Sequence, residues 1–255
     1  MNKKNFSFRS LINKLSHLNL RRLEECSTLI RWLEAKPRER ILDLGCGDGY
    51  YDSIIGASGA NVVGVDIHHQ RLATALQQNR NTDIQFHFMN AEELNFPDAS
   101  FDKAVSFCVV EHFNRDEQVM QHIARILKPG GSFIFSADSL SNPEITAEER
   151  IRHQLRYAVN TFYTAESVEE KLSRSGFQLE KTQYILNTPY ALALIRLSWK
   201  LDNLPRVLKL FRLLGFLALA ILGMATARFI SLPDFPAKGG LTLLVHARKP
   251  VAVHA

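Results

Sequence analysis

Short apolar runs alternate with stretches of helical period over most of the chain, from Arg40 to Leu186. The runs predict strands at Ile41–Leu44, Asn61–Val65, Ile84–Met89, Lys103–Val109, Ser132–Ala137 and Phe177–Leu186. The stretches between them predict helices at Tyr50–Ala57, His69–Asn79, Asp116–Leu127 and Thr164–Ser175. Strand and helix in strict turn indicate an α/β fold with a parallel, doubly wound sheet. Any ligand is then expected along the edge where the strands end.

The two ends of the chain follow other patterns. From Phe8 to Lys36 apolar residues recur three and four apart with Arg and Glu between them, which predicts helices that Pro37 closes. Leu241–Ala247 predicts a last strand, and almost fifty residues from Pro189 to Pro236 precede it. We therefore divide the chain into a helical cover (1–40), a core (41–188), an apolar basic helical insertion (189–238) and the last core strand with its tail (239–255).

The insertion combines a basic stripe with an uncharged run. Apolar residues at helical spacing (Leu204, Val207, Leu208, Phe211, Leu214) accompany a second stripe of Arg206, Lys209 and Arg212. Leu213–Ala227 then has fifteen residues without a charge. As a helix this run is about 22 Å long, against roughly 30 Å of hydrocarbon in a bilayer. Three interpretations remain open: a segment dipping into one leaflet, a lid over an apolar substrate, or a helix packed on its own domain or on a second subunit.

Composition places the chain among ordinary folded proteins. It has 255 residues, of which 46% are hydrophobic and 22% charged. Cys26, Cys46 and Cys108 show no paired spacing, so the sequence predicts neither a disulfide framework nor a cysteine zinc site, and a reducing compartment fits. The positive N-terminus lacks the apolar run of a signal peptide. We expect a cytoplasmic protein that can lie at a membrane surface.

Charge is distributed unevenly along the chain. The net charge of +5 divides into +6 for residues 1–40, −8 for residues 41–189 and +7 for residues 190–255. An acidic middle argues against a generally basic nucleic-acid-binding domain. The basic ends fit an anionic partner such as phospholipid or a phosphorylated substrate, or only solvated helix faces. The sequence does not predict an oligomeric state.

The strongest chemical signal is the segment DLGCGDGYY at residues 43–51, where an apolar strand runs into Gly45, Gly47 and Gly49 and then into a helix. Glycine lets the backbone turn sharply and lets a ligand touch it. The spacing differs from the G-x-G-x-x-G loop that binds a pyrophosphate. Asp43 could accept a hydrogen bond from the ammonium of an amino-acid ligand, or it could fix the loop.

A second signal is Asp66, which follows the strand Asn61–Val65. A carboxylate at the end of the second strand can accept both hydroxyls of a ribose and repels a 2′-phosphate. After a glycine loop, it predicts the second half of a nucleoside site.

Five segments in order resemble the class I S-adenosylmethionine-dependent methyltransferases of the small-molecule or lipid type: DLGCGDGYY, VVGVDIH, FMNAEELNFPDASFDKAV, FCVVEHF and ILKPGGSFIFS, between residues 43 and 136. The resemblance implies a Rossmann-like seven-stranded sheet whose last strand, LTLLVHA, is antiparallel, with S-adenosyl-L-methionine across the strand ends. By position it implies that Gly45, Gly47 and Gly49 line the methionine portion and that Asp66 binds ribose. It also implies that Asn90, Ala91 and Glu92 flank the adenine. Asn90 stands where the family often has Asp, and its amide oxygen can still accept a hydrogen bond from the adenine amino group.

Methyl transfer from a sulfonium mainly requires a nucleophile held close to it, so no metal is predicted. If the acceptor is a hydroxyl, a general base helps. His112 is the predicted base, and Glu111 could orient its imidazole or hold a substrate amine. The alternative is that both residues only support the strand end.

We interpret the sequence as that of a methyltransferase acting on an apolar or lipid-linked small molecule. One alternative is a catalytically silent cofactor-binding subunit of a biosynthetic complex, which intact cofactor motifs argue against. The other is a nucleic-acid methyltransferase, which the acidic middle disfavours. The acceptor, and whether oxygen, nitrogen or carbon is methylated, are not predicted.

Overall fold

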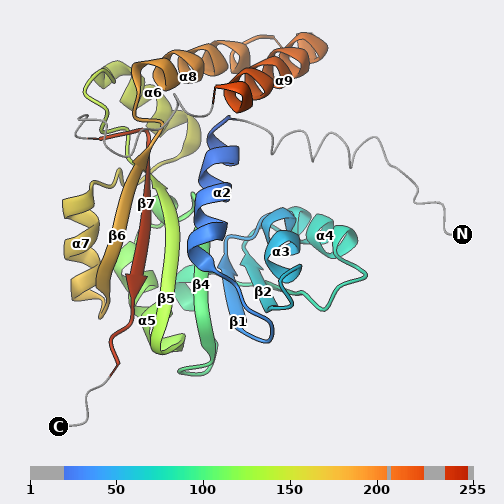
Figure 1. The fold of residues 1–255 in the computed structure, drawn as a ribbon, viewed down its shortest axis with the longest axis vertical. Coiled ribbons are helices and arrows are strands. Elements are labelled where there is room, and N and C mark those ends of the chain that lie inside the picture. Colours follow the sequence, from blue (N-terminus) through green and yellow to red (C-terminus); the bar gives the residue numbers. More distant parts are fainter. Residues whose placement is uncertain (1–19, 206–207, 227–238, 252–255) are drawn as a thin grey trace, which may run out of the picture.

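Seven strands join in the order β3-β2-β1-β4-β5-β7-β6 in a computed structural model that describes residues 20–205, 208–226 and 239–251 (Figure 1). They are β1 (Arg40–Leu44), β2 (Asn61–Asp66), β3 (Gln85–Phe88), β4 (Phe101–Phe107), β5 (Leu127–Asp138), β6 (Gln178–Ile185) and β7 (Thr242–Arg248). Strands β1 to β5 pair in parallel, and β7 runs antiparallel between β5 and β6. The predicted doubly wound sheet with a reversed last strand is confirmed.

Eight helices and two short turns accompany these strands in the described ranges. They are α2 (Leu20–Leu33), α3 (Tyr50–Gly56), α4 (His69–Gln78), α5 (Asp116–Ile126), α6 (Ala147–Tyr157), α7 (Ala165–Arg174), α8 (Pro189–Asp202), α9 (Lys209–Ala225), and the 3₁₀ turns η1 (Ala91–Glu93) and η2 (Val110–His112). The sequence did not predict α6. The first part of the predicted N-terminal helical segment and Arg206 of the predicted basic stripe lie outside the described residues.

Each face of the sheet carries its own hydrophobic core. Leu42 and Leu44 of β1 pack on the face covered by α5 and α7, whereas Ile41 packs on the face covered by α2 and α3. Because successive strand residues point to opposite faces, a strand buried on both faces is apolar at every position. This explains why the strands read as continuous apolar runs in the sequence.

A helical cap lies over the edge where the parallel strands end. Helices α6, α8 and α9 form it, at the top of Figure 1. Thr188 starts α8 by accepting a hydrogen bond from the Ala191 amide at 3.1 Å, and Pro189 occupies the first turn. Ala191 and Leu192 then pack into the core beneath α2, and α9 packs against α8 and α2. None of the described helices combines the length and the apolar character needed to cross a membrane.

Candidate functional site

The three glycines of the loop after β1 differ in the space beside them: one has free space where a Cβ would lie, and at the other two neighbouring side chains occupy it. Gly45, Gly47 and Gly49 have φ of 77°, 59° and 75°, a region in which other residues are strained. A Cβ on Gly45 would lie 2.5 Å from a methyl of Val109, and one on Gly49 would lie 2.6 Å from the Asn79 amide. At Gly47 a Cβ would have no neighbour within 4 Å. Gly47 is therefore the glycine that faces space for a ligand, while Gly45 and Gly49 allow close packing of the loop.

Asp66 holds the glycine loop against the end of β2. One carboxylate oxygen accepts the Gly47 amide at 2.9 Å and the other accepts the His68 amide at 2.7 Å. Each oxygen has a second acceptor position, so this arrangement fits a ribose with two adjacent hydroxyls. The next residue, Ile67, is 55% exposed although it is large and apolar. The sequence analysis overlooked Ile67, and its position directly after Asp66 was the available signal.

The three predicted adenine-flanking residues have different surroundings. The Asn90 amide oxygen accepts the Glu92 amide at 3.0 Å and caps η1, while Ala91 is buried. The Glu92 carboxylate accepts the Asn114 amide at 3.1 Å and forms an ion pair with Arg115. It thus holds the segment before α5. Adenine contact stays a prediction for Asn90, Ala91 and Glu92.

Two aspartates meet beneath the glycine loop. Asp43 of β1 is 1% exposed and Asp52 of α3 is fully buried, and their carboxyls lie within hydrogen-bonding reach of each other. Asp43 pairs across the sheet with Gly64, where an added Cβ would lie 2.8 Å from Asp52 Oδ1. The missing side chain of Gly64 makes the room for Asp52.

This aspartate pair has no counter-charge among the groups described. No described donor gives a hydrogen bond to any of the four oxygens. Burial, and after it the charge of Asp66, raises the pKa of Asp43 to about 7. Burial and the neighbouring Asp43 raise the pKa of Asp52 further above its usual range. The sequence analysis missed Asp52, for which the glycine inside β2 was the only signal.

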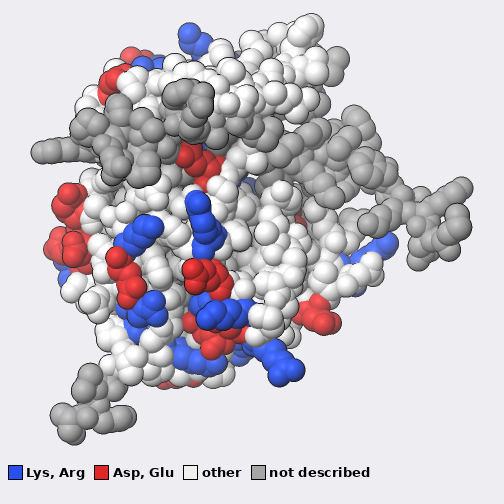
Figure 2. All heavy atoms as spheres, in the orientation of Figure 1, with Lys and Arg blue, Asp and Glu red and all other residues white. Residues whose placement is uncertain are grey.

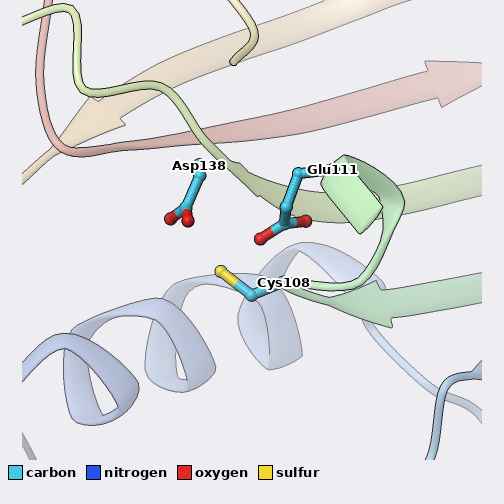
Figure 3. Close-up of side chains that lie close together, drawn as sticks. All are labelled: Cys108, Glu111 and Asp138. Atoms are coloured by element: carbon cyan, nitrogen blue, oxygen red, sulfur yellow. The ribbon is translucent and has the colours of Figure 1, made fainter. Parts of the chain in front are cut away.

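A second buried group lies where β4 and β5 end. Cys108, Glu111 and Asp138 point toward one another (Figure 3), with the thiol and the nearest carboxylate oxygens all within 4.8 Å. We call these three residues the acceptor-side cluster. Burial, with the charge of Asp138 adding to it, raises the pKa of Glu111 to about 8 despite the opposing charge of Arg21. Glu111 is therefore protonated at neutral pH.

Helix α2 brings a cation into this cluster. Arg21 Nη2 lies 2.7 Å from Cys108 Sγ and forms an ion pair with Asp138. Asp138 also accepts His153 Nε2 of α6 at 2.7 Å. Although burial opposes ionisation, Arg21 and His153 hold the pKa of Asp138 at about 2. Three potential metal ligands thus surround a guanidinium of the same chain.

Helix α2 forms a second buried ion pair one turn further along. Glu25 is fully buried, accepts the Ser136 hydroxyl and lies 3.4 Å from Arg22 Nη1. Arg22 also donates to the Phe107 carbonyl at 3.2 Å. The sequence analysis assigned no role to Arg21, Arg22 or Glu25, because no local pattern links residues more than eighty positions apart.

His112 and Glu111 lie on opposite sides of η2. His112 is exposed and its Nδ1 lies 3.1 Å from the Ala158 carbonyl, which can only accept, so Nδ1 carries the proton and Nε2 is the basic nitrogen. Glu111 instead faces the cluster, and its backbone carbonyl accepts the Asn160 amide at 2.8 Å. We had expected Glu111 to orient the imidazole of His112. In the structure it does not, because the tight turn directs the two adjacent side chains apart. His153, whose Nδ1 is buried without a described partner, is a second imidazole on this side.

Sequence comparison identifies the core. A family model described as a methyltransferase domain matches residues 42–135, which contain the glycine loop, Asp66 and the end of β4. Residues 42–135 form a class I S-adenosylmethionine-dependent methyltransferase domain. S-adenosylmethionine is the cofactor of this family.

Individual relatives are named as methyltransferases. A Mycolicibacterium smegmatis protein named as a probable S-adenosylmethionine-dependent methyltransferase is 32% identical over 56% of this chain and 53% of its own length. The 24-methylenesterol C-methyltransferase 2 of Oryza sativa subsp. japonica is 34% identical over 51% of this chain and 37% of its own. The chain thus matches about half or less of these relatives.

A solved structure shares the overall fold. An S-adenosylmethionine-dependent methyltransferase from Mesorhizobium loti superposes with a TM-score of 0.62 at 22% identity, over 87% of this chain and 96% of the other. This similarity extends well beyond residues 42–135 and shows a common fold.

Proposed function

We propose that this methyltransferase domain transfers the methyl group of S-adenosylmethionine to an apolar or lipid-linked small molecule at a membrane surface. The observation that carries the choice of acceptor is the exposed apolar face of α9 in the cap above the strand ends. The sterol named for the Oryza relative is an acceptor of the same chemical class.

The residues of the cofactor side fit S-adenosylmethionine. Gly47 leaves space beside the backbone, and Asp66 offers two oxygens for a ribose. Ile67 presents an exposed apolar side chain on which the adenine ring can pack. Asp43 and Asp52 place two buried carboxyls near the loop, where the cationic methionine end is expected. When bound, the sulfonium supplies an activated methyl group. Gly45, Gly49, Asn90 and Ala91 would shape the walls of this site.

Helix α9 exposes one broad apolar face. Phe211, Leu214, Leu217, Ile221 and Leu222 are all exposed, and their spacing places them on one side, whereas Leu219 is buried toward the domain. Figure 2 shows this end of the molecule largely white, with charged side chains gathered lower on the same face. Between Asn203 and Pro233 the sequence holds no Asp or Glu. An apolar face beside basic residues favours the surface of an anionic bilayer.

His112 is our candidate for the proton acceptor when the acceptor atom is a hydroxyl. The Ala158 carbonyl fixes the ring with Nε2 basic, and the exposed position lets an acceptor approach. Glu111, protonated and turned into the cluster, supports the strand end rather than the ring. Methylation of carbon or nitrogen would need less help from His112.

The test of function uses methyl-labelled S-adenosylmethionine and the lipid extract of a strain lacking the gene. We expect label in the organic phase, in a methylated product. The precursor of this product, which is lighter by one methylene, should accumulate in the deletion strain. The Asp66→Ala variant should leave the label in the aqueous phase. Absence of organic-phase label, with label on an aqueous product instead, would replace the lipid acceptor by a polar one, and label on nucleic acid would favour the alternative class. Absence of any labelled product would favour a catalytically silent subunit.

The membrane contact is tested by sedimentation with vesicles of phosphatidylglycerol and phosphatidylcholine. The protein should sediment at low salt and dissociate in part at high salt, because basic side chains near the surface contribute about 1 kcal/mol each. Phe211→Ser with Ile221→Ser should weaken binding, and so should replacing Arg206, Lys209 and Arg212 by Gln. Leu76→Ser, on an equally exposed residue of α4, is the matched control. A wild-type protein that stays in the supernatant would show that α9 has another partner.

A further inference from the structure

The aspartate pair under the glycine loop holds two carboxyls where only one negative charge can be sustained. Asp43 and Asp52 are both buried, and they lie side by side because Gly64 leaves room between β2 and α3. Two buried carboxylates at this separation repel each other strongly, and the low dielectric offers little screening. A shared proton removes that repulsion and makes one oxygen a donor to its neighbour.

The groups that surround the pair do not supply a positive charge. The loop contributes the Cys46 thiol and Asp48, and β2 contributes Asp66. From α2 the Cys26 thiol faces Asp43, and burial with the nearby Glu25 raises the pKa of that thiol to about 12, so it is neutral. Within the described part of the chain, the pair therefore lacks a cation of its own.

Arg22 is the cation that α2 carries on this side, and it is committed to other groups. Its guanidinium bonds to Glu25 and to the Phe107 carbonyl at the end of β4. The neighbouring strand β4 pairs with Asp43 through Val105, which has no charge. The Asp43–Asp52 pair differs in this respect from Asp138, which forms an ion pair with Arg21.

We propose that both carboxyls of the Asp43–Asp52 pair are protonated in the cofactor-free protein under mildly acidic conditions, and that binding the cationic methionine end of S-adenosylmethionine expels the proton of Asp43 to solvent while Asp52 keeps its own. The proposal rests on the proposed cofactor site and adds to it a positioning residue, Asp52, and a proton-coupled binding step. Asp43 receives the ammonium group as a carboxylate only after it has lost its proton, and the proton left on Asp52 prevents two adjacent negative charges. No bond other than O–H breaks.

The balance of charge gives the expected size of the effect. The pKa of Asp43 near 7 and the raised pKa of Asp52 mean that both carboxyls hold their protons for most of the time at pH 6. Binding should then release about one proton, and the dissociation constant should rise about tenfold for each pH unit below 7. Above that pH the release should fade.

Isothermal titration of the full chain measures this directly. S-adenosylmethionine is titrated at pH 6 in phosphate and in imidazole, two buffers of different ionisation enthalpy, so that the difference in heat counts the protons released. 5′-Methylthioadenosine, which lacks the amino-acid portion, is the control ligand and should release none. This comparison needs no variant, so it holds even where a substitution disturbs folding.

Asp52→Asn keeps the shape and replaces the protonated Asp52 by a permanent donor. It should still release about one proton at pH 6, because burial keeps the pKa of Asp43 raised. Asp43→Asn removes the group that titrates, so it should bind S-adenosylmethionine with no proton release and with an affinity that is flat between pH 6 and 7.5. Both variants leave intact His68 and His69, the imidazoles at the start of α4.

The possible outcomes distinguish this inference from the proposed function. Wild-type binding without proton release, equal release with 5′-methylthioadenosine, or wild-type release in Asp43→Asn would each overturn the proton-coupled step while leaving the cofactor site in place. Absence of S-adenosylmethionine binding at every pH would overturn the proposed function itself.

Discussion

Two buried acidic groups lie along the same edge of the sheet and are treated in opposite ways. At the ends of β4 and β5, Asp138 and Glu25 each have an arginine of α2 beside them. Beneath the glycine loop, Asp43 and Asp52 have only each other among the described residues. Arginine side chains of α2 compensate the charge of the first group. The second group has no cation beside it among the described residues.

This difference separates stability from binding. Breaking a buried ion pair by removing one partner is costly, so Arg21 and Asp138 should act chiefly in holding α2 on the sheet. A buried acidic pair without a counter-ion costs stability in the free protein and gains it back only from a cationic ligand. We therefore expect changes on the β4–β5 side to alter unfolding and changes on the β1–β2 side to alter cofactor binding.

The largest expected effect concerns which imidazole on the β4–β5 side does chemistry. If His112 deprotonates a hydroxyl acceptor, His112→Ala should lower turnover by roughly 10²- to 10⁴-fold with little change in cofactor affinity. His153→Ala should mainly destabilise the fold, since His153 is buried against Asp138. Steady-state kinetics and thermal unfolding of both variants decide between them. Near-normal turnover in His112→Ala would exclude the base role.

Arg21→Met should lower the free energy of unfolding by roughly 3 kcal/mol, because it leaves Asp138 buried without its main counter-charge. Urea unfolding at pH 7 measures this. Arg152→Met, which breaks an exposed ion pair with Glu148 on α6, is the control and should leave the curve unchanged. Adding Asp138→Asn to Arg21→Met should recover part of the loss. Equal stability of wild type and Arg21→Met would mean that the guanidinium is dispensable.

Asp66→Ala tests the β1–β2 side. The charge-assisted hydrogen bonds to a ribose are worth roughly 1.5 to 3 kcal/mol, so S-adenosylmethionine should bind on the order of 10- to 150-fold more weakly. Calorimetric titration at pH 7.5 provides the measurement. Asp66→Asn, which keeps one acceptor oxygen, should lose less. Wild-type affinity in Asp66→Ala would remove the ribose assignment.

Glu111→Gln should change how the stability of the β4–β5 side depends on pH. The folded pKa of Glu111, about 8, lies above its unfolded value near 4.3, so the folded state binds the proton more tightly. That stabilisation is complete below pH 4.3 and is lost as pH rises toward 8. Glu111→Gln has no proton to lose at this position. Its free energy of unfolding should therefore rise relative to that of the wild type by up to about 1.4 kcal/mol per pH unit between pH 5 and 8. Parallel stability curves would place the titration elsewhere.

The sequence predicted the sheet well because each element carries its own local signal. Strands such as Lys103–Val109 and Ser132–Ala137 hold short runs of apolar residues, and the helices between the strands are amphipathic. Helix α6 was missed because its sequence, AEERIRHQLRY, is mostly polar, although Thr146 and Glu149 form a capping box that could have marked its start. The glycines and Asp66 were found because ligand-binding loops keep a fixed spacing from the strand before them.

The rest of the site could not be predicted, because it depends on pairs formed only in the folded chain. Arg21 and Asp138 are 117 positions apart, and the local sequence around either residue does not predict their ion pair. Asp52 looked like an ordinary helix residue until Gly64 brought it against Asp43. The neighbours Glu111 and His112 looked like a working pair, and the turn between them separates their side chains.

The position of β7 has a consequence for the newly made chain. It lies between β5 and β6, and among the described strands β6 pairs with β7 alone. Yet 56 residues, including α8 and α9, separate Ile185 from Thr242. At synthesis rates of about 5–20 residues per second, β6 and the exposed edge of β5 wait roughly 3–11 s for their partner. During that interval the open sheet and the apolar face of α9 are present together, so the moment of greatest risk of aggregation precedes the last strand.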